Sequence, residues 1–297
     1  MKTSRSLSLI LALLLLFLPA FAEAPFVVTD MLEREVTLKG PARRVVVLQP
    51  GDAEILYAIG AQDVLIGRGE YVNYPQEVLS VPSVQSGYEI NFEQIIALNP
   101  DVVIMTKMGQ KVEDQQKLLD AGIQTFMTDA QTVEDVYEAV ALLGQLTGKT
   151  ENAEEVVASM KAGFDALSEK AAGKSGVTVY FEASPLEFGL WTTGKNTFMD
   201  DIAGILNLDN IFADVEGWNS VSEEQVLSRD PDIIVTTTMY FGEGPTPVEE
   251  IMARANWGQV KAVKNNKVFN ADADAITRPG PRLVDAAEAL YSFVYGE

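Results

Sequence analysis

The 297-residue sequence contains no cysteine and no histidine. These absences exclude Ser-His-Asp and Cys-His nucleophile systems, as well as zinc sites built on imidazole or thiolate ligands. Without cysteine the fold has no disulfides, and no cysteine can carry a lipid after a signal sequence. The sequence also lacks a glycine-rich phosphate loop of the P-loop or dinucleotide type. An enzyme that uses Ser-Lys or paired carboxylates stays open, but no motif favours it. We expect no catalysis, no cofactor and no resident metal.

Positive charge is also scarce. The chain has 22 Lys and Arg residues against 43 Asp and Glu residues, which gives a formal charge of −21. A surface of this sign repels nucleic acid and anionic lipid, and it favours partners that carry basic patches. We therefore expect no nucleic acid among the partners.

The first 22 residues have the three parts of a secretory signal peptide. Lys2 and Arg5 precede an apolar run from Leu7 to Leu18, and Ala20-Phe21-Ala22 offers a small-x-small cleavage site. The alternative is a signal anchor, but the run is shorter than the roughly 20 residues that a membrane span needs. Cleavage after Ala22 removes two positive charges and changes the formal charge from −21 to −23. We expect a periplasmic protein without membrane insertion after cleavage.

The rest of the chain predicts alternating strands and helices. Apolar residues make up 47% of the chain, which is typical of globular proteins, and the length suffices for two domains. RRVVVLQ (43–49) and VLIGRG (64–69) predict short buried strands, a pattern typical of parallel sheets covered on both faces. Residues 132–172 have a helical pattern that is interrupted near 144–150. The second part is long enough for a helix of about 20 residues.

One phrase occurs twice in the chain. NFEQIIALNPDVVIMT (91–106) and SEEQVLSRDPDIIVTT (222–237) each predict a short helix, a Pro-Asp turn and an apolar strand. The copies lie on either side of the predicted long helix, so each marks the same element of two similar lobes. Ligands bind beyond the carboxyl ends of the strands in open parallel sheets, and two such lobes that face each other form a cleft.

These patterns predict an α/β fold of two lobes with parallel sheets. We predict a signal peptide at 1–22, an N-terminal lobe at 23–147, an interlobe helix at 148–174 and a C-terminal lobe at 175–297. In the second lobe KVFNADAD predicts a strand along which Asp272 and Asp274 alternate, too far apart for a calcium loop. Pro281 suits the first turn of the last helix. We expect Trp257 and Arg282 to be structural.

Several motifs follow one another in an order that resembles one family. They are DAEILYAIGA after the first strand, both copies of the repeated phrase, WTTGKNTFMDDIAGILNLDNI, W-x-x-V-x-A-V-x-x-x-x-V-F from Trp257 to Phe269, and RPGPRLVDAAEALY. Over essentially the whole mature chain they resemble the periplasmic substrate-binding proteins of ABC importers for ferric siderophores, haem and cobalamin. The resemblance implies two Rossmann-like lobes joined by a single long, rigid helix. It also implies capture of a metal chelate in the cleft with little closure.

The resemblance further implies the partners. We expect a monomer that docks on an ABC importer permease and its ATPase. In that family one surface glutamate of each lobe docks into arginine pockets of the permease, and the matching positions are Glu93 and Glu224. A carboxylate is favourable near a helix N-terminus, so the simpler alternative is that each is only a helix-start charge. Because Glu223 lies beside Glu224, either of the two could be the docking glutamate of the second lobe.

The candidates for the ligand cleft follow the predicted strand ends. Aromatic side chains among them offer the flat contact area that suits a macrocycle or a catecholate. Arg278 could pair with an anionic ligand group, with a local salt bridge as the alternative. The candidates are Gln49, Pro50, Tyr71, Tyr74, Tyr88, Lys107, Met108, Glu182, Trp191, Trp218, Met239, Tyr240 and Arg278.

The residue types among the cleft candidates allow a comparison of the three ligand types that the resemblance implies. A corrinoid is nearly neutral and needs mainly aromatic and polar walls, which favours it slightly. Ferric siderophores usually carry negative charge, and the candidate residues include few basic side chains. Haem without histidine would need a cleft tyrosine or Met239 as its axial ligand. The related group that binds free zinc or manganese is excluded, because its sites need imidazoles. A ligand-sensing receptor domain with the same lobes stays open.

Overall fold

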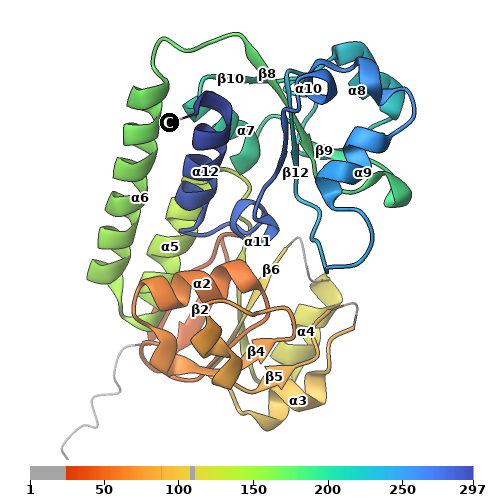
Figure 1. Ribbon diagram of the computed structural model, residues 1–297. Helices are drawn as coiled ribbons and strands as arrows, with labels where there is room; N and C mark the ends of the chain where they lie inside the picture. Colours follow the sequence, from red (N-terminus) through yellow and green to blue (C-terminus); the bar gives the residue numbers. More distant parts are fainter. Residues whose placement is uncertain (1–24, 88, 108–110, 297) are drawn as a thin grey trace, which may run out of the picture.

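The computed structural model describes residues 25–87, 89–107 and 111–296 (Figure 1). The predicted signal peptide, Tyr88 and Met108 lie outside these residues. Within them no helix combines the length and the apolar character needed to cross a membrane. The described chain forms two α/β lobes, and the N-terminal lobe lies below the C-terminal lobe in Figure 1.

The N-terminal lobe is built on a parallel sheet in the order β5-β4-β3-β6-β7. Its strands are β3 (Val45–Val47), β4 (Leu65–Gly69), β5 (Ser83–Val84), β6 (Val102–Thr106) and β7 (Gln124–Thr128). An antiparallel hairpin of β1 (Phe26–Thr29) and β2 (Glu35–Leu38) precedes the sheet. The helices of this lobe are α2 (Pro50–Ala58), α3 (Phe92–Ala97) and α4 (Val112–Asp120), with short 3-10 turns at Gln62–Val64 and Gln76–Ser80.

The C-terminal lobe repeats this plan with a parallel sheet in the order β10-β8-β12-β13. Its strands are β8 (Val177–Glu182), β10 (Leu208–Asn210), β12 (Ile233–Thr236) and β13 (Val268–Asn270), and β9 (Trp191–Thr193) pairs with β11 (Trp218–Ser220) beside the sheet. The helices are α7 (Phe198–Ile205), α8 (Glu223–Arg229), α9 (Pro247–Ala253), α10 (Lys261–Lys264), α11 (Ala273–Thr277) and α12 (Leu283–Tyr295). Further 3-10 turns lie at Leu186–Phe188 and Trp257–Gln259.

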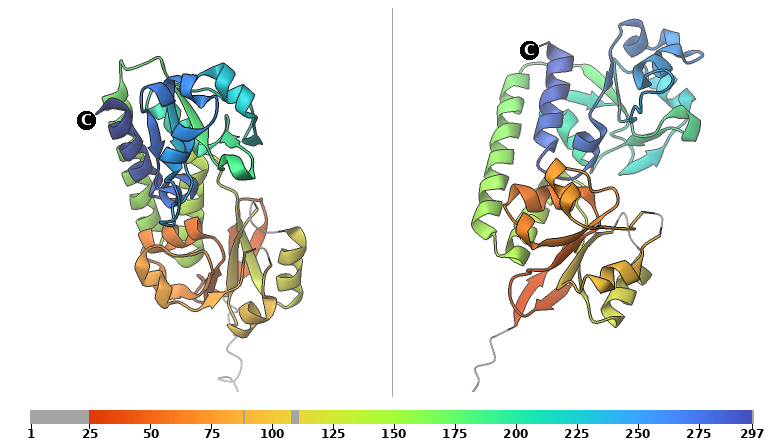
Figure 2. Two further views of the ribbon diagram at one scale, coloured as in Figure 1. Left: turned by 45° about the vertical axis from the view of Figure 1, so that its right-hand side comes forward. Right: turned by 60° about the horizontal axis from the view of Figure 1, so that its bottom comes forward.

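A helical hairpin joins the lobes. It consists of α5 (Val133–Thr147) and α6 (Thr150–Ala171), and α6 runs beside both lobes with α12 next to it (Figures 1 and 2). The 22 residues of α6 span roughly 33 Å at 1.5 Å per residue. The hairpin turns at Gly148, whose φ of 70° is the left-handed conformation that glycine adopts readily. One long helix therefore carries the chain between the lobes.

The packing of α5 on α6 depends on a second glycine, Gly144. A Cβ atom at this position would overlap the Cβ atom of Ala153 on α6. We therefore expect Gly144→Ala to lower the free energy of unfolding by about 1–3 kcal/mol, because the helices must move apart. Gly204 on α7 has open space around it, so Gly204→Ala is the matched control and should raise stability by up to about 1 kcal/mol through helix propensity. Urea denaturation followed by circular dichroism measures the change in the free energy of unfolding of both variants. Changes of the same sign in the two variants would contradict the close contact between α5 and α6.

The repeated phrase occupies equivalent places in the two lobes. Strand β6 lies between β3 and β7, and β12 lies between β8 and β13. After the proline of each copy, Asp101 accepts hydrogen bonds from the backbone N–H groups of Arg43 and Arg44, and Asp232 accepts one from Thr178 N–H. Each carboxylate thereby ties the start of its strand to the neighbouring parallel strand. This shared structural task accounts for the repeated Pro-Asp turn.

Two expectations about the C-terminal lobe are wrong in detail. The predicted strand stops at Asn270, and Asp272 is the N-cap of α11, where its side chain accepts from Ala275 N–H. An aspartate at the N-cap position satisfies a backbone N–H group at the start of a helix, which favours a helix start at Asp272. Asp272 and Asp274 therefore do not alternate along one strand. The last helix begins at Leu283, so Pro281 precedes its first turn.

Candidate ligand-binding site

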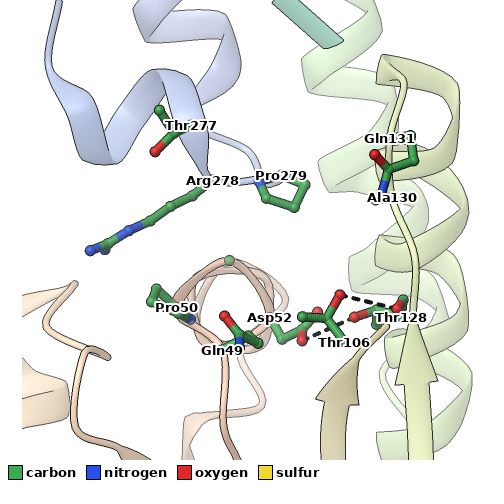
Figure 3. A pocket seen from close by; sticks show the side chains of 11 residues that line it. Gln49, Pro50, Asp52, Thr106, Thr128, Ala130, Gln131, Thr277, Arg278 and Pro279 are labelled. Atoms are coloured by element: carbon green, nitrogen blue, oxygen red, sulfur yellow. Dashed lines mark hydrogen bonds between the residues drawn. The ribbon is translucent and has the colours of Figure 1, made fainter. Parts of the chain in front are cut away.

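A cavity of about 290 Å³ lies between the lobes (Figure 3). The N-terminal lobe contributes residues 49–52 at the start of α2, Thr106 and Thr128 at the ends of β6 and β7, and residues 130–131. The C-terminal lobe contributes residues 277–279, at the end of α11 and directly after it. The cavity therefore lies beyond the carboxyl ends of parallel strands, where open α/β sheets bind ligands.

The local sequence allows the lobes to approach closely here. Gln49 is the N-cap of α2 and Pro50 its first residue, a position for which the fixed φ of proline is suited. At Gly51 a Cβ atom would lie 2.8 Å from the carbonyl oxygen of Pro279, in the other lobe. Glycine at position 51 thus permits the contact that closes one side of the cavity.

A second cavity of about 540 Å³ lies on the C-terminal lobe. Met239, Tyr240 and Phe241 in the loop after β12 form an apolar wall, and their side chains are 50%, 46% and 86% exposed. Figure 1 shows this loop, between β12 and α9, reaching toward the N-terminal lobe. Four carboxylate residues line the same cavity: Glu182, Glu187, Glu243 and Glu250. We call Met239, Tyr240 and Phe241 the apolar wall.

The structure brings together some of the predicted cleft residues. Gln49, Pro50 and Arg278 line the interlobe cavity, and Glu182, Met239 and Tyr240 line the C-terminal cavity. Of the other candidates that the structure describes, none lines either cavity; these are Tyr71, Tyr74, Lys107, Trp191 and Trp218.

Each of these five residues has a different environment. Tyr71 is 64% exposed after β4, and Arg282 lies over the ring of Tyr74 at 4.1 Å. Lys107 pairs with a carboxylate of its own lobe, Asp129, at 2.8 Å. Trp191 is 44% exposed on β9. The half-buried Trp218 on β11 packs against Phe198, with ring centroids 6.0 Å apart.

Glu182 borders the C-terminal cavity, but both of its carboxylate oxygens are already bonded. Nη1 and Nη2 of Arg254 donate to them at 2.6 and 2.9 Å, and both side chains are almost fully buried. Burial raises the pKa of Glu182, while the bonds from Arg254 oppose that rise. Arg254 also lies over the ring of the fully buried Trp257 at 4.5 Å. The pair therefore supports the wall of the cavity, and Trp257 is structural as expected.

A second buried ion cluster links the lobes. Glu54 on α2 is 4% exposed and accepts hydrogen bonds from Arg282 at 2.7 Å and from Arg278 at 3.0 Å. Arg278 also donates to Asn73 at 2.7 Å and pairs with Asp274 at 2.6 Å. The guanidinium of Arg278 thus has local partners, which is the alternative that the sequence left open. We call Glu54, Arg278 and Arg282 the interlobe clamp.

Sequence reasoning did not identify two acidic residues of α2, Asp52 and Glu54. Asp52 is 5% exposed and borders the interlobe cavity, where its Oδ2 accepts from Thr128 Oγ1 at 3.1 Å. Burial raises the pKa of Asp52 to about 7, with the Thr128 bond acting in the opposite direction. The sequence signal for them was the presence of two acidic residues in an otherwise apolar helix. A buried charge usually has a partner or a function, so these two positions could have been singled out. Within the described residues no cluster of three or more acidic groups could hold a metal ion.

Glu93 and Glu224 occupy the same position in their helices, the second residue of α3 and of α8. Both side chains are exposed, and neither carboxylate bonds to another described residue. Glu223 differs, because its Oε2 accepts a hydrogen bond from the indole Nε1 of Trp257 at 2.7 Å. The structure therefore distinguishes the two neighbouring glutamates: Glu223 has an internal partner, and Glu224 faces solvent.

Known proteins resemble this chain over most of its length. Residues 45–275 match the family described as periplasmic binding protein. An uncharacterized ABC transporter substrate-binding lipoprotein of Bacillus subtilis is 34% identical over 91% of this chain and 86% of its own. The crystal structure of the periplasmic vitamin B12 binding protein of Vibrio cholerae has a TM-score of 0.73 and 27% identity, covering 86% of this chain and 97% of its own.

A Staphylococcus epidermidis structure, named as a possible iron-binding (periplasmic solute-binding) protein, has a TM-score of 0.74 and 28% identity over 86% of this chain and 99% of its own. The two lobes with parallel sheets, the cavity between them and these similarities agree with one another. The chain belongs to the periplasmic binding protein family.

Proposed function

We propose that this protein captures a metal chelate between its lobes and delivers it unchanged to the permease of an ABC importer. Its membership of the periplasmic binding protein family and its 34% identity to an ABC transporter substrate-binding protein support this role. Capture in the cleft requires no chemistry on the ligand, and the long helix α6 between the lobes limits the motion to a small closure. We further propose that the protein acts as a monomer.

A nearly neutral corrinoid is the chelate that we favour. The observation that carries this choice is the charge of the cavity walls: among the described lining residues Arg278 is the only basic side chain, and Glu54 and Asp274 already pair with it. An anionic ferric siderophore would therefore meet carboxylates without an available cation. The 27% identity to a vitamin B12 binding protein also supports a corrinoid. The 28% identity to the Staphylococcus epidermidis protein keeps a ferric siderophore as the second candidate.

Docking on the permease is proposed to use Glu93 and Glu224. Both carboxylates are exposed at helix starts and have no described internal partner, so they are available to basic pockets. The Bacillus subtilis relative is named a lipoprotein, whereas this chain has no cysteine that could be lipidated. We therefore propose a free protein in the periplasm, exported by the predicted signal peptide.

The apolar wall gives the proposed site a direct test. Truncating the 86% exposed Phe241 in Phe241→Ala removes ring area that a bound macrocycle would cover. Because fully burying a phenylalanine contributes about 1.5–3 kcal/mol, we expect cyanocobalamin affinity to fall by roughly 10- to 150-fold. Isothermal titration calorimetry measures the change.

Phe188 supplies the matched control. It lies on the same lobe and is 76% exposed, but it lines neither cavity in the described part of the chain. Phe188→Ala should leave the affinity within about twofold, which is 0.4 kcal/mol. Equal losses in the two variants would contradict a site at the apolar wall.

A further inference from the structure

Among the described residues, only one oxygen of the Asp52 carboxyl group accepts a hydrogen bond. Its Oδ2 accepts from Thr128 Oγ1 at 3.1 Å, and no described residue donates to its Oδ1. The residue is 5% exposed, and it borders the interlobe cavity (Figure 3). Buried carboxyl groups usually have their hydrogen bonds satisfied. The open oxygen therefore leaves a place for a donor group from a ligand.

The neighbouring charged groups are engaged elsewhere. On α2, Glu54 binds the two arginines of the interlobe clamp, and Figure 3 shows the Arg278 guanidinium pointing away from Asp52. After β7, Asp129 pairs with Lys107. At the start of α5, Asp135 accepts from the backbone N–H groups of residues 131 and 132. Among the described residues, no cation compensates the charge of Asp52.

A neutral primary amide fits this environment in either protonation state of Asp52. An ionised carboxylate accepts from the amide N–H, and a protonated carboxyl can also donate to the amide oxygen. A carboxylate on the ligand can bind only when Asp52 is protonated, because two close anions in a buried site repel. The cavity volume of about 290 Å³ is suited to a short side arm of a chelate.

We propose that Asp52 is a specificity-determining residue that receives a neutral amide arm of the chelate and rejects a carboxylate arm. The proposal rests on the proposed capture of a chelate in the cleft. Corrinoids carry acetamide and propionamide arms, whereas haem carries two carboxylate arms. Asp52 would thus separate the two macrocycles by the charge of their arms, before any contact with the metal.

The first test compares cyanocobalamin with monocarboxylic acids in which one propionamide arm is hydrolysed, between pH 5.5 and 8.5. Because burial raises the pKa of Asp52 to about 7, its ionised form accumulates above that pH. For the derivative whose carboxylate reaches Asp52, we expect affinity to fall by about tenfold per pH unit there. Cyanocobalamin itself should change by less than about threefold over the range.

Asp52→Asn should remove this pH dependence, because asparagine stays neutral and preserves the shape of the side chain. Asp63→Asn, at an exposed aspartate of the same lobe, is the control and should retain the dependence. If every derivative followed the pH profile of cyanocobalamin, or if Asp52→Asn kept the dependence, the proposal would be overturned.

A second measurement needs neither a variant nor a corrinoid. Free propionamide and propionate are added at millimolar concentration to the mature protein at pH 8, and the carboxyl carbon resonance of Asp52 is followed by NMR. Propionamide should shift this resonance and propionate should not. No shift with propionamide, or equal shifts, would overturn the role of Asp52. A propionamide shift without cyanocobalamin binding would support Asp52 and reject the corrinoid as ligand.

Discussion

Replacing both Glu93 and Glu224 with lysine is expected to abolish ligand delivery while ligand affinity stays within about twofold. Close charge pairs at protein interfaces have coupling energies of about 1.5–7 kcal/mol. Two lost pairs of about 2 kcal/mol each would weaken docking by roughly 10³-fold, and reversal adds repulsion between like charges. Uptake into proteoliposomes that contain the permease and its ATPase measures delivery, and calorimetry measures ligand affinity.

The control for this experiment carries the same net charge. Glu154 and Glu155 are exposed on α6, so their replacement by lysine changes the net charge equally at another surface. This variant should retain uptake. Glu223→Gln should also retain uptake, because Glu223 bonds to Trp257 within the lobe. Normal uptake by the Glu93/Glu224 variant would contradict docking through these residues and would favour a ligand-sensing receptor.

The second large effect is expected at the interlobe clamp. Glu54→Ala leaves the guanidinium groups of Arg278 and Arg282 without their shared carboxylate, although both side chains are largely buried. Removing one partner of a buried ion pair typically costs about 3–5 kcal/mol. Arg278 retains its pair with Asp274, so the charge left without a close carboxylate is mainly that of Arg282, whose next carboxylate, Asp272, is 3.8 Å away. Urea denaturation should therefore show a loss of this size in the free energy of unfolding.

Two comparisons separate the clamp from a general effect of lost charge. Asp214→Ala breaks a more exposed pair with Arg229 and should cost no more than about 1 kcal/mol. Replacing all three clamp residues with apolar ones of similar size should recover much of the stability lost in Glu54→Ala. A loss below about 1 kcal/mol in Glu54→Ala would show that the clamp does not stabilise the arrangement of the lobes.

The sequence predicted the parallel lobes because their signals are local and repeated. Each copy of the repeated phrase contains a helix start, a Pro-Asp turn and an apolar strand, and the same order returns around β6 and β12. The long helix was also predictable, since residues 150–171 have a helical pattern without a break. The hairpin of β1 and β2 was missed, because its four-residue strands have no strong turn signal between them.

The site was only partly predictable, because its partners are distant in sequence. Gln49 and Pro50 follow a strand end, so their place at the cavity could be predicted. The bond between Arg278 and Glu54 joins residues 224 positions apart, which no local pattern contains. Trp218 was predicted for the cleft, but pairing of β11 with β9 places it against Phe198. Such pairings depend on how the elements pack, and no single segment specifies them.

The most direct test of the proposed function is a parallel titration of the purified mature protein with four ligands, followed by tryptophan fluorescence. They are cyanocobalamin, a ferric catecholate, a ferric hydroxamate and haemin. Trp191, 44% exposed, is the most accessible reporter, and Trp257 is fully buried. We expect saturable quenching by cyanocobalamin alone, with one site per chain. Saturation by a siderophore or haemin instead would contradict the corrinoid, and no response to any of the four would contradict the capture of a metal chelate.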